Sequence, residues 1–366
     1  MNLPTVAAAA ALLLVFACTE AGSKESAGGP ETKRAARAVR AATDKTPLVS
    51  RSRKLMGTVF TLSAAHVSEA KAQPALLAGL QEIARLETLL SEWLEDSEIS
   101  RINRAAGRHP VEVGSDTFAV VEAGVRVSAW SEGAFDLSWA ALRGLYLFQP
   151  GARRIPRASE IRGRLPLVNY RDIVLDKGKG TVFLRRRGMK IGTGGIAKGY
   201  ALDRAGRILT AAGIDNYMLF GGGQVQVRGR RDERPWRVGI QHPRATDYIG
   251  FLELSAGSLS TSGDYEHAFV VDGERWHHII DPRDGLPVPH TSSVTVVAAS
   301  GLYADALSTA VFVLGPERAF ERRSSAPVGF DAVVLDREMR LWESANSASR
   351  LVLKVTLEDG KLPMVR

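Results

Sequence analysis

A glycine-rich stretch, KIGTGGIAKGYALD at residues 190–203, is the most informative feature of this chain. Its glycines come directly before an amphipathic segment whose single lysine is Lys198. Glycine lets backbone N–H groups approach an anion closely, and a helix N-terminus carries about half a positive charge. A lysine within the first turn adds a full charge. The stretch therefore predicts a loop and helix that bind a phosphate group.

Two common phosphate-binding patterns do not describe this stretch. A P-loop needs serine or threonine after its lysine, whereas Gly199 follows Lys198. A dinucleotide-binding fold needs an acidic residue at the end of the next strand, whereas Asp215 precedes the apolar run 217–220. A glycine-rich turn that simply enters a helix is the alternative when the segment is considered alone.

The composition is that of a soluble globular protein with a substantial core, since 45% of the residues are hydrophobic and 24% are charged. The net charge is +8, and many basic residues lie in two clusters, at 33–40 and 185–187. No aromatic residue interleaves with either cluster. We therefore interpret them as a solvated linker and a solvated turn, and we expect no nucleic-acid partner.

The N-terminal segment is apolar over residues 3–17, too short to span a membrane comfortably, and ends at Cys18, the only cysteine. Because residues 15–18 resemble a bacterial lipobox, residues 1–18 are predicted to be a lipoprotein signal with lipidation of Cys18. Residues 19–50, rich in Gly, Ser, Ala, Lys and Glu, are predicted to be a flexible tether. These predictions place the protein in the bacterial cell envelope, lipid-anchored on the periplasmic side of a membrane. A buried core helix is the alternative for the apolar run.

Hydrophobic periodicity divides the rest of the chain into long helices and short strands. Helices are predicted at about 74–94, at 116–130 with a cap at Ser115 or Asp116, from the glycine stretch to about 212, and at 304–314. Strands are predicted at 57–64, 173–175 and 182–184, and repeatedly from 217 to 297. This pattern favours an α+β fold in one catalytic domain over residues 51–366.

Asp305 and Thr309 are four residues apart in a predicted helix, so their oxygens face the same way. A carboxylate and a hydroxyl suit Mg²⁺, a hard cation that shares oxygen ligands with substrate phosphates. A helix cap or a surface pair is the alternative. The apolar residues around the pair favour a metal, because an unpaired carboxylate in such a helix would be costly.

His277 and His278 lie in a predicted strand that runs into a Pro/Gly turn, and alternation should send their rings to opposite faces. One ring can therefore enter a cleft, where a histidine with a pKa near neutrality is suited to proton transfer. A structural role for both is the alternative. Trp93, next to a polar loop, suits either the core or a platform on which a flat ring stacks.

Eight segments, taken in order, resemble the ApbE family of FAD:protein FMN transferases between about residues 53 and 316. They are MGTVF (56–60), SEWLEDSEISRIN (91–103), GAFDLS (133–138), GGIAKGYALD (194–203), FGGGQVQVRG (220–229), TSGDYE (261–266), HHIIDPRDGLPV (277–288) and ADALSTAVFVLG (304–315). The resemblance implies a T-fold-like α+β architecture with antiparallel sheets packed against helices. It also implies Mg²⁺-dependent transfer of FMN from FAD to a Ser or Thr hydroxyl of an exported acceptor protein, with release of AMP.

The resemblance also assigns site residues. FAD as substrate would contact Met56, Trp93, Ala134, Phe135, Asp136, Lys198, His278 and Ile279. Mg²⁺ would be bound by Gly195, through its carbonyl oxygen, and by Asp305 and Thr309. Lys198 would stabilise the charge of the breaking pyrophosphate, and His278 is our hypothesis for the group that accepts the hydroxyl proton.

The expected partners are FAD, the membrane through lipidated Cys18, and an acceptor flavoprotein subunit of a membrane redox complex. Two other functions stay open. In one, water replaces the acceptor and the protein is a Mg²⁺-dependent FAD pyrophosphatase giving FMN and AMP. In the other, the protein is a non-catalytic FAD-binding lipoprotein.

One departure from the family pattern concerns the glycine stretch, where Gly192-Thr193 stands in place of the usual Asp-Leu. The missing carboxylate removes a polar contact that the resemblance implies for FAD. A Gly192→Asp variant therefore tests whether the change weakened FAD binding or shifted activity, and tighter FAD binding in it would show what the chain has lost.

Overall fold

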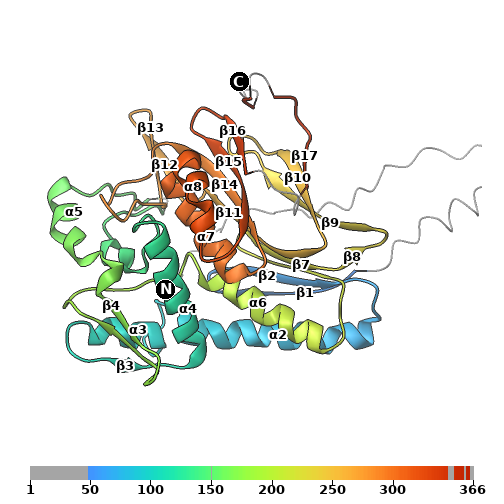
Figure 1. Cartoon of the computed structure of the whole chain (residues 1–366), viewed down its shortest axis with the longest axis horizontal. Coiled ribbons are helices and arrows are strands. Elements are labelled where there is room, and N and C mark those ends of the chain that lie inside the picture. The colour runs from blue at the N-terminus through green and yellow to red at the C-terminus, as the bar shows by residue number, and fades with distance from the viewer. Residues whose placement is uncertain (1–47, 150, 345–349, 358–359, 363–366) are drawn as a thin grey trace, which may run out of the picture. The chain divides into compact units, whose positions relative to one another are not determined.

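The computed structural model describes residues 48–149, 151–344, 350–357 and 360–362 of the 366-residue chain. Its centre is a sheet of eight strands in the order β1-β2-β6-β7-β11-β14-β15-β16, in which all neighbours run antiparallel (Figure 1). The predicted α+β class, with antiparallel sheets packed against helices, is confirmed. The strands are β1 Val49–Leu55, β2 Thr58–Ala64, β6 Tyr217–Gly221, β7 Gln224–Arg228, β11 Ala256–Gly263, β14 Thr291–Ala298, β15 Phe330–Asp336 and β16 Leu341–Glu343.

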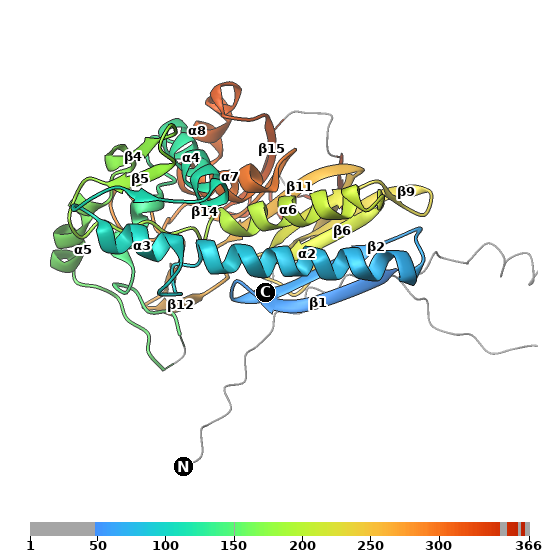
Figure 2. The same cartoon turned by 90° about the horizontal axis from the view of Figure 1, so that it is seen from below.

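Helices cover one face of this sheet. Helices α2 and α6 lie side by side along it (Figure 2), and α7 packs against α6 and β14. The helices are α2 Glu69–Leu90, α3 Glu98–Ala105, α4 Ser115–Trp130, α5 Ala158–Arg164, α6 Ala197–Ala211, α7 Gly301–Leu314 and α8 Pro316–Glu321, with 3₁₀ turns η1 Leu137–Leu142, η2 Leu165–Leu167, η3 Tyr170–Asp172 and η4 Arg323–Ser325.

The opposite face is covered by a second sheet of four strands. Alternation along β14 shows the two layers: Val294 and Val296 pack with the helices, whereas Val297 packs with the second sheet. Two smaller sheets lie outside these layers. The second sheet has the order β17 (Arg350–Leu353), β10 (Tyr248–Leu254), β9 (Arg234–Gln241), β8 (Arg230–Arg231); the smaller ones are β3 (Val111–Glu112), β5 (Thr181–Leu184), β4 (Ile173–Asp176), and β12 (Ala268–Val271) with β13 (Glu274–His277).

Two helix boundaries differ from the sequence prediction. Helix α2 spans Glu69–Leu90 rather than 74–94, because Ser91 turns into an extended conformation. The N-cap of α4 is Gly114 without a side-chain cap, rather than Ser115 or Asp116. Asp116 instead accepts hydrogen bonds from the Tyr200 hydroxyl (2.6 Å) and Arg85 Nη2 (2.6 Å), and so ties α4 to α6 and α2.

Strand β1 begins at Val49, close to the predicted start of the folded domain. The described residues lie within one compact unit, Thr46–Arg366. The predicted signal, Cys18 and all but the end of the predicted tether lie outside the described residues. Within the described part of the chain, no helix is both long and apolar enough to cross a membrane.

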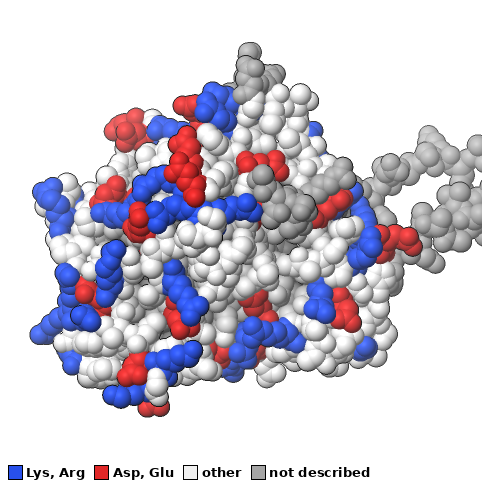
Figure 3. All heavy atoms as spheres, in the orientation of Figure 1, with Lys and Arg blue, Asp and Glu red and all other residues white. Residues whose placement is uncertain are grey.

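Charged side chains are mixed on the face that Figure 3 shows, where Lys and Arg alternate with Asp and Glu. Charged side chains of the described residues also form ion pairs, such as Arg322 with Glu132 at 2.9 Å and Arg237 with Glu253 at 2.8 Å. Exposed pairs of this kind contribute little stability individually.

Candidate functional site

The backbones of α6 and α7 come into contact at Gly199 of α6 and Gly301 of α7. A Cβ atom on Gly199 would lie 1.9 Å from the carbonyl oxygen of Gly301, so only glycine permits this contact. One turn further along α6, the Asp203 carboxylate accepts hydrogen bonds from the backbone N–H groups of Gly301 (2.7 Å) and Leu302 (3.0 Å) and from the Ser300 hydroxyl (2.8 Å). A carboxylate stabilises a helix N-terminus. The contact therefore fixes α7, which carries the predicted metal ligands.

Asp305 lies inside this contact, with 3% of its surface exposed. Its Oδ2 accepts a hydrogen bond from Gly199 N at 3.0 Å. Burial raises the pKa of the carboxyl group, while the charge of Lys198 and the hydrogen bonds from the backbone oppose that shift. Because an ionised carboxylate at this depth is costly without a cation, the position fits a metal ligand.

Gly195, just before α6, lies beside Thr309 of α7. A Cβ on Gly195 would lie 3.4 Å from Thr309 Oγ1 and 3.3 Å from Cε2 of Phe135. In the described residues, no three His, Cys, Asp or Glu side chains lie close enough to hold a metal. A metal at this position would therefore need hydroxyl, carbonyl and substrate oxygens beside the Asp305 carboxylate, which is a ligand set that suits Mg²⁺.

Lys198 stands at the start of α6. Its Nζ donates a hydrogen bond to the carbonyl oxygen of Gly194 at 2.5 Å, and its stem packs against Gly222. Its positive charge opposes the rise that burial causes in the pKa of Asp305, and it adds a small part to the fall that desolvation causes in the pKa of His278. The ammonium group is therefore close enough to act on the predicted metal ligand and on the predicted base.

Met56 lies in the two-residue turn that joins β1 to β2. Met56 and Gly57 both have positive φ angles, 47° and 76°, as tight hairpins with primed turns require. The backbone N–H of Met56 donates to Glu87 Oε1 at 2.6 Å, which anchors the turn to α2. The side chain of Thr58, which follows this turn, lies beside Gly222 and the stem of Lys198, so the turn borders the same site.

The two histidines separate as predicted. His277 ends β13, is buried, and its Nε2 lies 2.9 Å from the carbonyl oxygen of Val288. His278 is exposed, with its Nδ1 2.9 Å from the carbonyl oxygen of Glu266.

The pKa of His278 differs from the near-neutral value expected from the sequence. Desolvation by the protein around the ring lowers it to about 4, and the charge of His267, whose ring meets His278 edge to face at 5.4 Å, contributes to the same shift. This pKa lies below the near-neutral value, and the role of His278 in proton transfer stays a prediction. The ring is neutral and weakly basic at pH 7.

The other predicted flavin contacts fall into two groups. Trp93 is 75% exposed, in the loop that follows α2, and so is not a core residue; its use as a stacking platform stays a prediction. Ala134, Phe135 and Ile279 are buried. Their contact with FAD stays a prediction.

Asp136 is buried, and both of its carboxylate oxygens are used within the protein. They accept hydrogen bonds from Ser138 N (2.7 Å), Ser138 Oγ (2.6 Å) and Tyr170 N (2.8 Å), and burial raises the pKa of the group. The side chain therefore holds the start of η1 against η3. A contact between Asp136 and FAD also stays a prediction.

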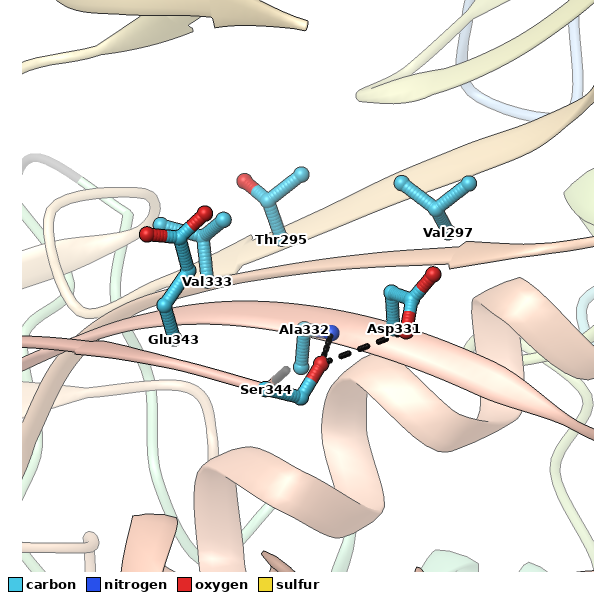
Figure 4. Close-up of a pocket in the computed structure, with 7 residues that line it drawn as sticks. All are labelled: Thr295, Val297, Asp331, Ala332, Val333, Glu343 and Ser344. Atoms are coloured by element: carbon cyan, nitrogen blue, oxygen red, sulfur yellow. Dashed lines mark hydrogen bonds between the residues drawn. The ribbon is translucent and has the colours of Figure 1, made fainter. Parts of the chain in front are cut away.

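A small cavity lies between β14, β15 and the end of β16 (Figure 4). Its volume is about 10 Å³, enough for one water molecule and far too small for a nucleotide. The Ser344 hydroxyl accepts a hydrogen bond from Ala332 N at 2.8 Å beside it. None of its lining residues belongs to the predicted site.

Sequence reasoning missed three residues that shape the site. Asp203 holds α7, and Glu92 pairs with Arg143 beside Trp93. The position of Glu92, directly before Trp93 in SEWLED, could have marked it as a residue near the candidate site. No local pattern distinguishes Arg143 or Asp203 from other charged residues near helix ends.

Comparisons with known proteins identify the family of the chain. A FAD:protein FMN transferase of Klebsiella pneumoniae is 36% identical over 272 residues, which are 74% of this chain and 83% of that protein. A second one, of Vibrio cholerae, is 34% identical and matched over 63% of this chain and 70% of its own length.

Solved structures give the same result. The ApbE protein of Thermotoga maritima superposes with a TM-score of 0.74 at 31% identity, over 81% of this chain and 97% of that one. The flavin transferase ApbE of Vibrio cholerae gives a TM-score of 0.73 at 28% identity, over 82% and 98%. Residues 56–334 match the model of the ApbE family. This chain therefore belongs to the ApbE family.

Proposed function

We propose that this protein transfers FMN from FAD to a serine or threonine hydroxyl of an acceptor protein, with AMP as the second product and Mg²⁺ as the required ion. The observation that carries the proposal is that α6 and α7 bring Lys198, Asp305 and Thr309 together beside the glycine stretch. The name of the relatives, FAD:protein FMN transferase, supports the same reaction.

In this reaction the acceptor oxygen forms a bond to the phosphorus of the FMN phosphate. The bond between that phosphorus and the bridging pyrophosphate oxygen breaks, and AMP leaves with that oxygen. Negative charge grows on the bridging oxygen, and the charge of Lys198 would stabilise it. Asp305, Thr309 and the Gly195 carbonyl would hold Mg²⁺, which supplies further stabilisation of charge on the phosphate oxygens.

His278 is our candidate to accept the proton that the acceptor hydroxyl loses. The imidazole is neutral at pH 7 because its pKa is about 4, so a ring nitrogen can take a proton. The low pKa makes it a weak base. The proton therefore moves as the new bond to phosphorus forms, when the hydroxyl becomes more acidic.

The decisive experiment mixes the full chain with FAD and Mg²⁺, with and without the flavin-accepting subunit of a membrane redox complex. Transfer predicts a fluorescent acceptor on a denaturing gel and one AMP for each flavin attached. EDTA should abolish both. FMN and AMP at the same rate without acceptor would instead indicate a pyrophosphatase, and unchanged FAD that remains bound would indicate a flavin carrier. Either result would overturn the proposal.

We also propose that Cys18 is lipidated and holds the protein on the periplasmic side of a membrane, where its acceptor is an exported flavoprotein subunit. This part rests on the N-terminal sequence alone. In cells fed a labelled fatty acid, the wild-type chain should carry the label and sediment with membranes, whereas Cys18→Ala should do neither. An unlabelled wild-type chain would contradict it.

A further inference from the structure

A tryptophan and an arginine stack at the rim of the site. The guanidinium carbon of Arg143, which follows η1, lies over the ring of Trp93 at 4.7 Å from its centroid. The same group is 5.3 Å from the ring centroid of Trp139. Arginine attracts an aromatic face electrostatically and also covers it. One face of Trp93 is therefore covered, while the side chain as a whole is 75% exposed.

Glu92 holds this arginine in place. Its carboxylate forms a close ion pair with Arg143 Nη2, and the two side chains are only 8% and 22% exposed. In the described part of the chain, Glu92 Oε2 and Arg143 Nη2 have no hydrogen-bond partner besides this ion pair. Each charge therefore depends on the other, because a partly buried charge without a partner is costly.

Gly192 provides the space that this pair fills. A Cβ atom on Gly192 would lie 2.3 Å from Glu92 Oε2 and 2.8 Å from Arg143 Nη2. Its φ angle is not in the left-handed region, so the requirement for glycine here is one of space and not of conformation. The backbone N–H of Gly192 donates to the carbonyl oxygen of Leu137 at 2.9 Å, which fixes the glycine stretch beside η1. A carboxylate at position 192, whose effect the sequence left open, would therefore displace this pair.

We infer that Arg143 is a positioning residue for the flavin ring. Glu92 fixes Arg143, Arg143 covers one face of Trp93, and the other face of the indole is presented to the isoalloxazine ring of FAD. This inference rests on the proposed function, in which FAD is the substrate. An exposed tryptophan without such support would sample several rotamers, and ordering it would reduce affinity.

The test is a titration of FAD against each variant, followed by the quenching of flavin fluorescence that stacking on an indole causes. Arg143→Ala and Arg143→Lys should both weaken FAD binding about five- to tenfold and reduce the quenching of bound flavin. Lysine keeps the charge but lacks the flat guanidinium, so a loss in both variants points to stacking. The matched control is Arg237→Ala, which removes an arginine 4.5 Å from the Phe251 ring on the second sheet and should change neither value.

A rescue experiment separates positioning from general stability. Gly192→Asp and Glu92→Ala should each weaken FAD binding about tenfold, since the first displaces Glu92 and the second releases Arg143. Glu92→Ala combined with Gly192→Asp should recover to within about threefold of wild type, because the new carboxylate can pair with Arg143. The inference would be overturned if the two single variants melted at the wild-type temperature and the double variant lost as much FAD affinity as the two single losses added together.

The outcomes also distinguish the inference from the proposed function. Wild-type affinity and quenching in Arg143→Ala, with normal FMN transfer by the wild type, would overturn the inference alone. FAD binding with the expected variant effects, but without transfer, would overturn the function alone. A wild-type chain that binds no FAD would overturn both.

Discussion

The contact between α6 and α7 is buried and formed around two glycines, whereas the rim of the candidate site, at Trp93 and His278, is exposed. At the contact, Gly199 N donates to Asp305 and the two helices touch at glycines. At the rim, Trp93 is covered by an arginine, and His278 has an exposed ring. The buried part of the site should therefore tolerate almost no change in shape, and the rim should respond in a graded way.

Asp305→Asn should have the largest effect, because it removes the buried carboxylate on which Mg²⁺ binding would depend. We expect the rate of FMN transfer to fall about 100-fold or more, with no return at high Mg²⁺. Without metal, the free energy of unfolding should stay the same or rise, because a costly buried carboxylate is gone. Transfer rates across a Mg²⁺ titration and thermal melts measure the two effects.

The pH dependence of stability gives a second check on Asp305. Burial raises its pKa, so in the metal-free protein its contribution is most favourable below the unfolded value of about 3.9 and is lost as pH rises through the folded pKa. That dependence should be absent from Asp305→Asn. The control is Asp331→Asn, which breaks a partly buried pair between β15 and Arg323 of η4 and should lower stability without changing transfer. Equal loss of transfer in both variants would contradict the assignment.

Gly199→Ala should destabilise the protein more than the addition of any other single methyl group at the α6–α7 contact. The new Cβ would lie 1.9 Å from the Gly301 carbonyl oxygen, so α6 and α7 must separate. Overpacking of this kind costs about 1–3 kcal/mol of the free energy of unfolding. Chemical denaturation measures the loss, and transfer should fall with it because Asp305 moves away from Lys198.

The control for this change is another glycine inside a helix. A Cβ atom on Gly163 of α5 would meet no other atom within 4 Å, so Gly163→Ala should be neutral or slightly stabilising. If both alanine variants melted at the same temperature, the α6–α7 contact would not be a rigid element.

Residues that are close together in the chain could be predicted as site residues from the sequence, whereas residues that meet only in the fold could not. Asp305 and Thr309 are one helical turn apart, and Lys198 lies within the glycine stretch, so local spacing was enough to propose them as site residues. The fold class followed from periodicity in the same way. Arg143 stands far from Glu92 in the chain, and the two meet only because η1 packs beside the loop after α2. The end of α2 was misplaced because its apolar spacing continues to Trp93, although the backbone turns at Ser91.

The pKa of His278 could not be predicted either, since desolvation and the His267 ring come from the folded surroundings. The lowered pKa of His278 leads to the prediction with the smallest expected effect on the rate of FMN transfer. Because the ring is neutral above a pKa of about 4, the rate of FMN transfer should be flat from about pH 6 to pH 8 and should fall only as pH approaches 4. A pH–rate profile with saturating FAD and acceptor measures this.

Two variants sharpen that profile. His278→Gln should remove the fall near pH 4 and lower the rate at pH 7, if the ring accepts the hydroxyl proton. His267→Gln should move the fall to higher pH, because it removes the charge that disfavours protonation of His278. A profile that stays unchanged in both variants would assign proton acceptance to another group. The rim would then act only in binding, and the chemistry would belong entirely to the contact between α6 and α7.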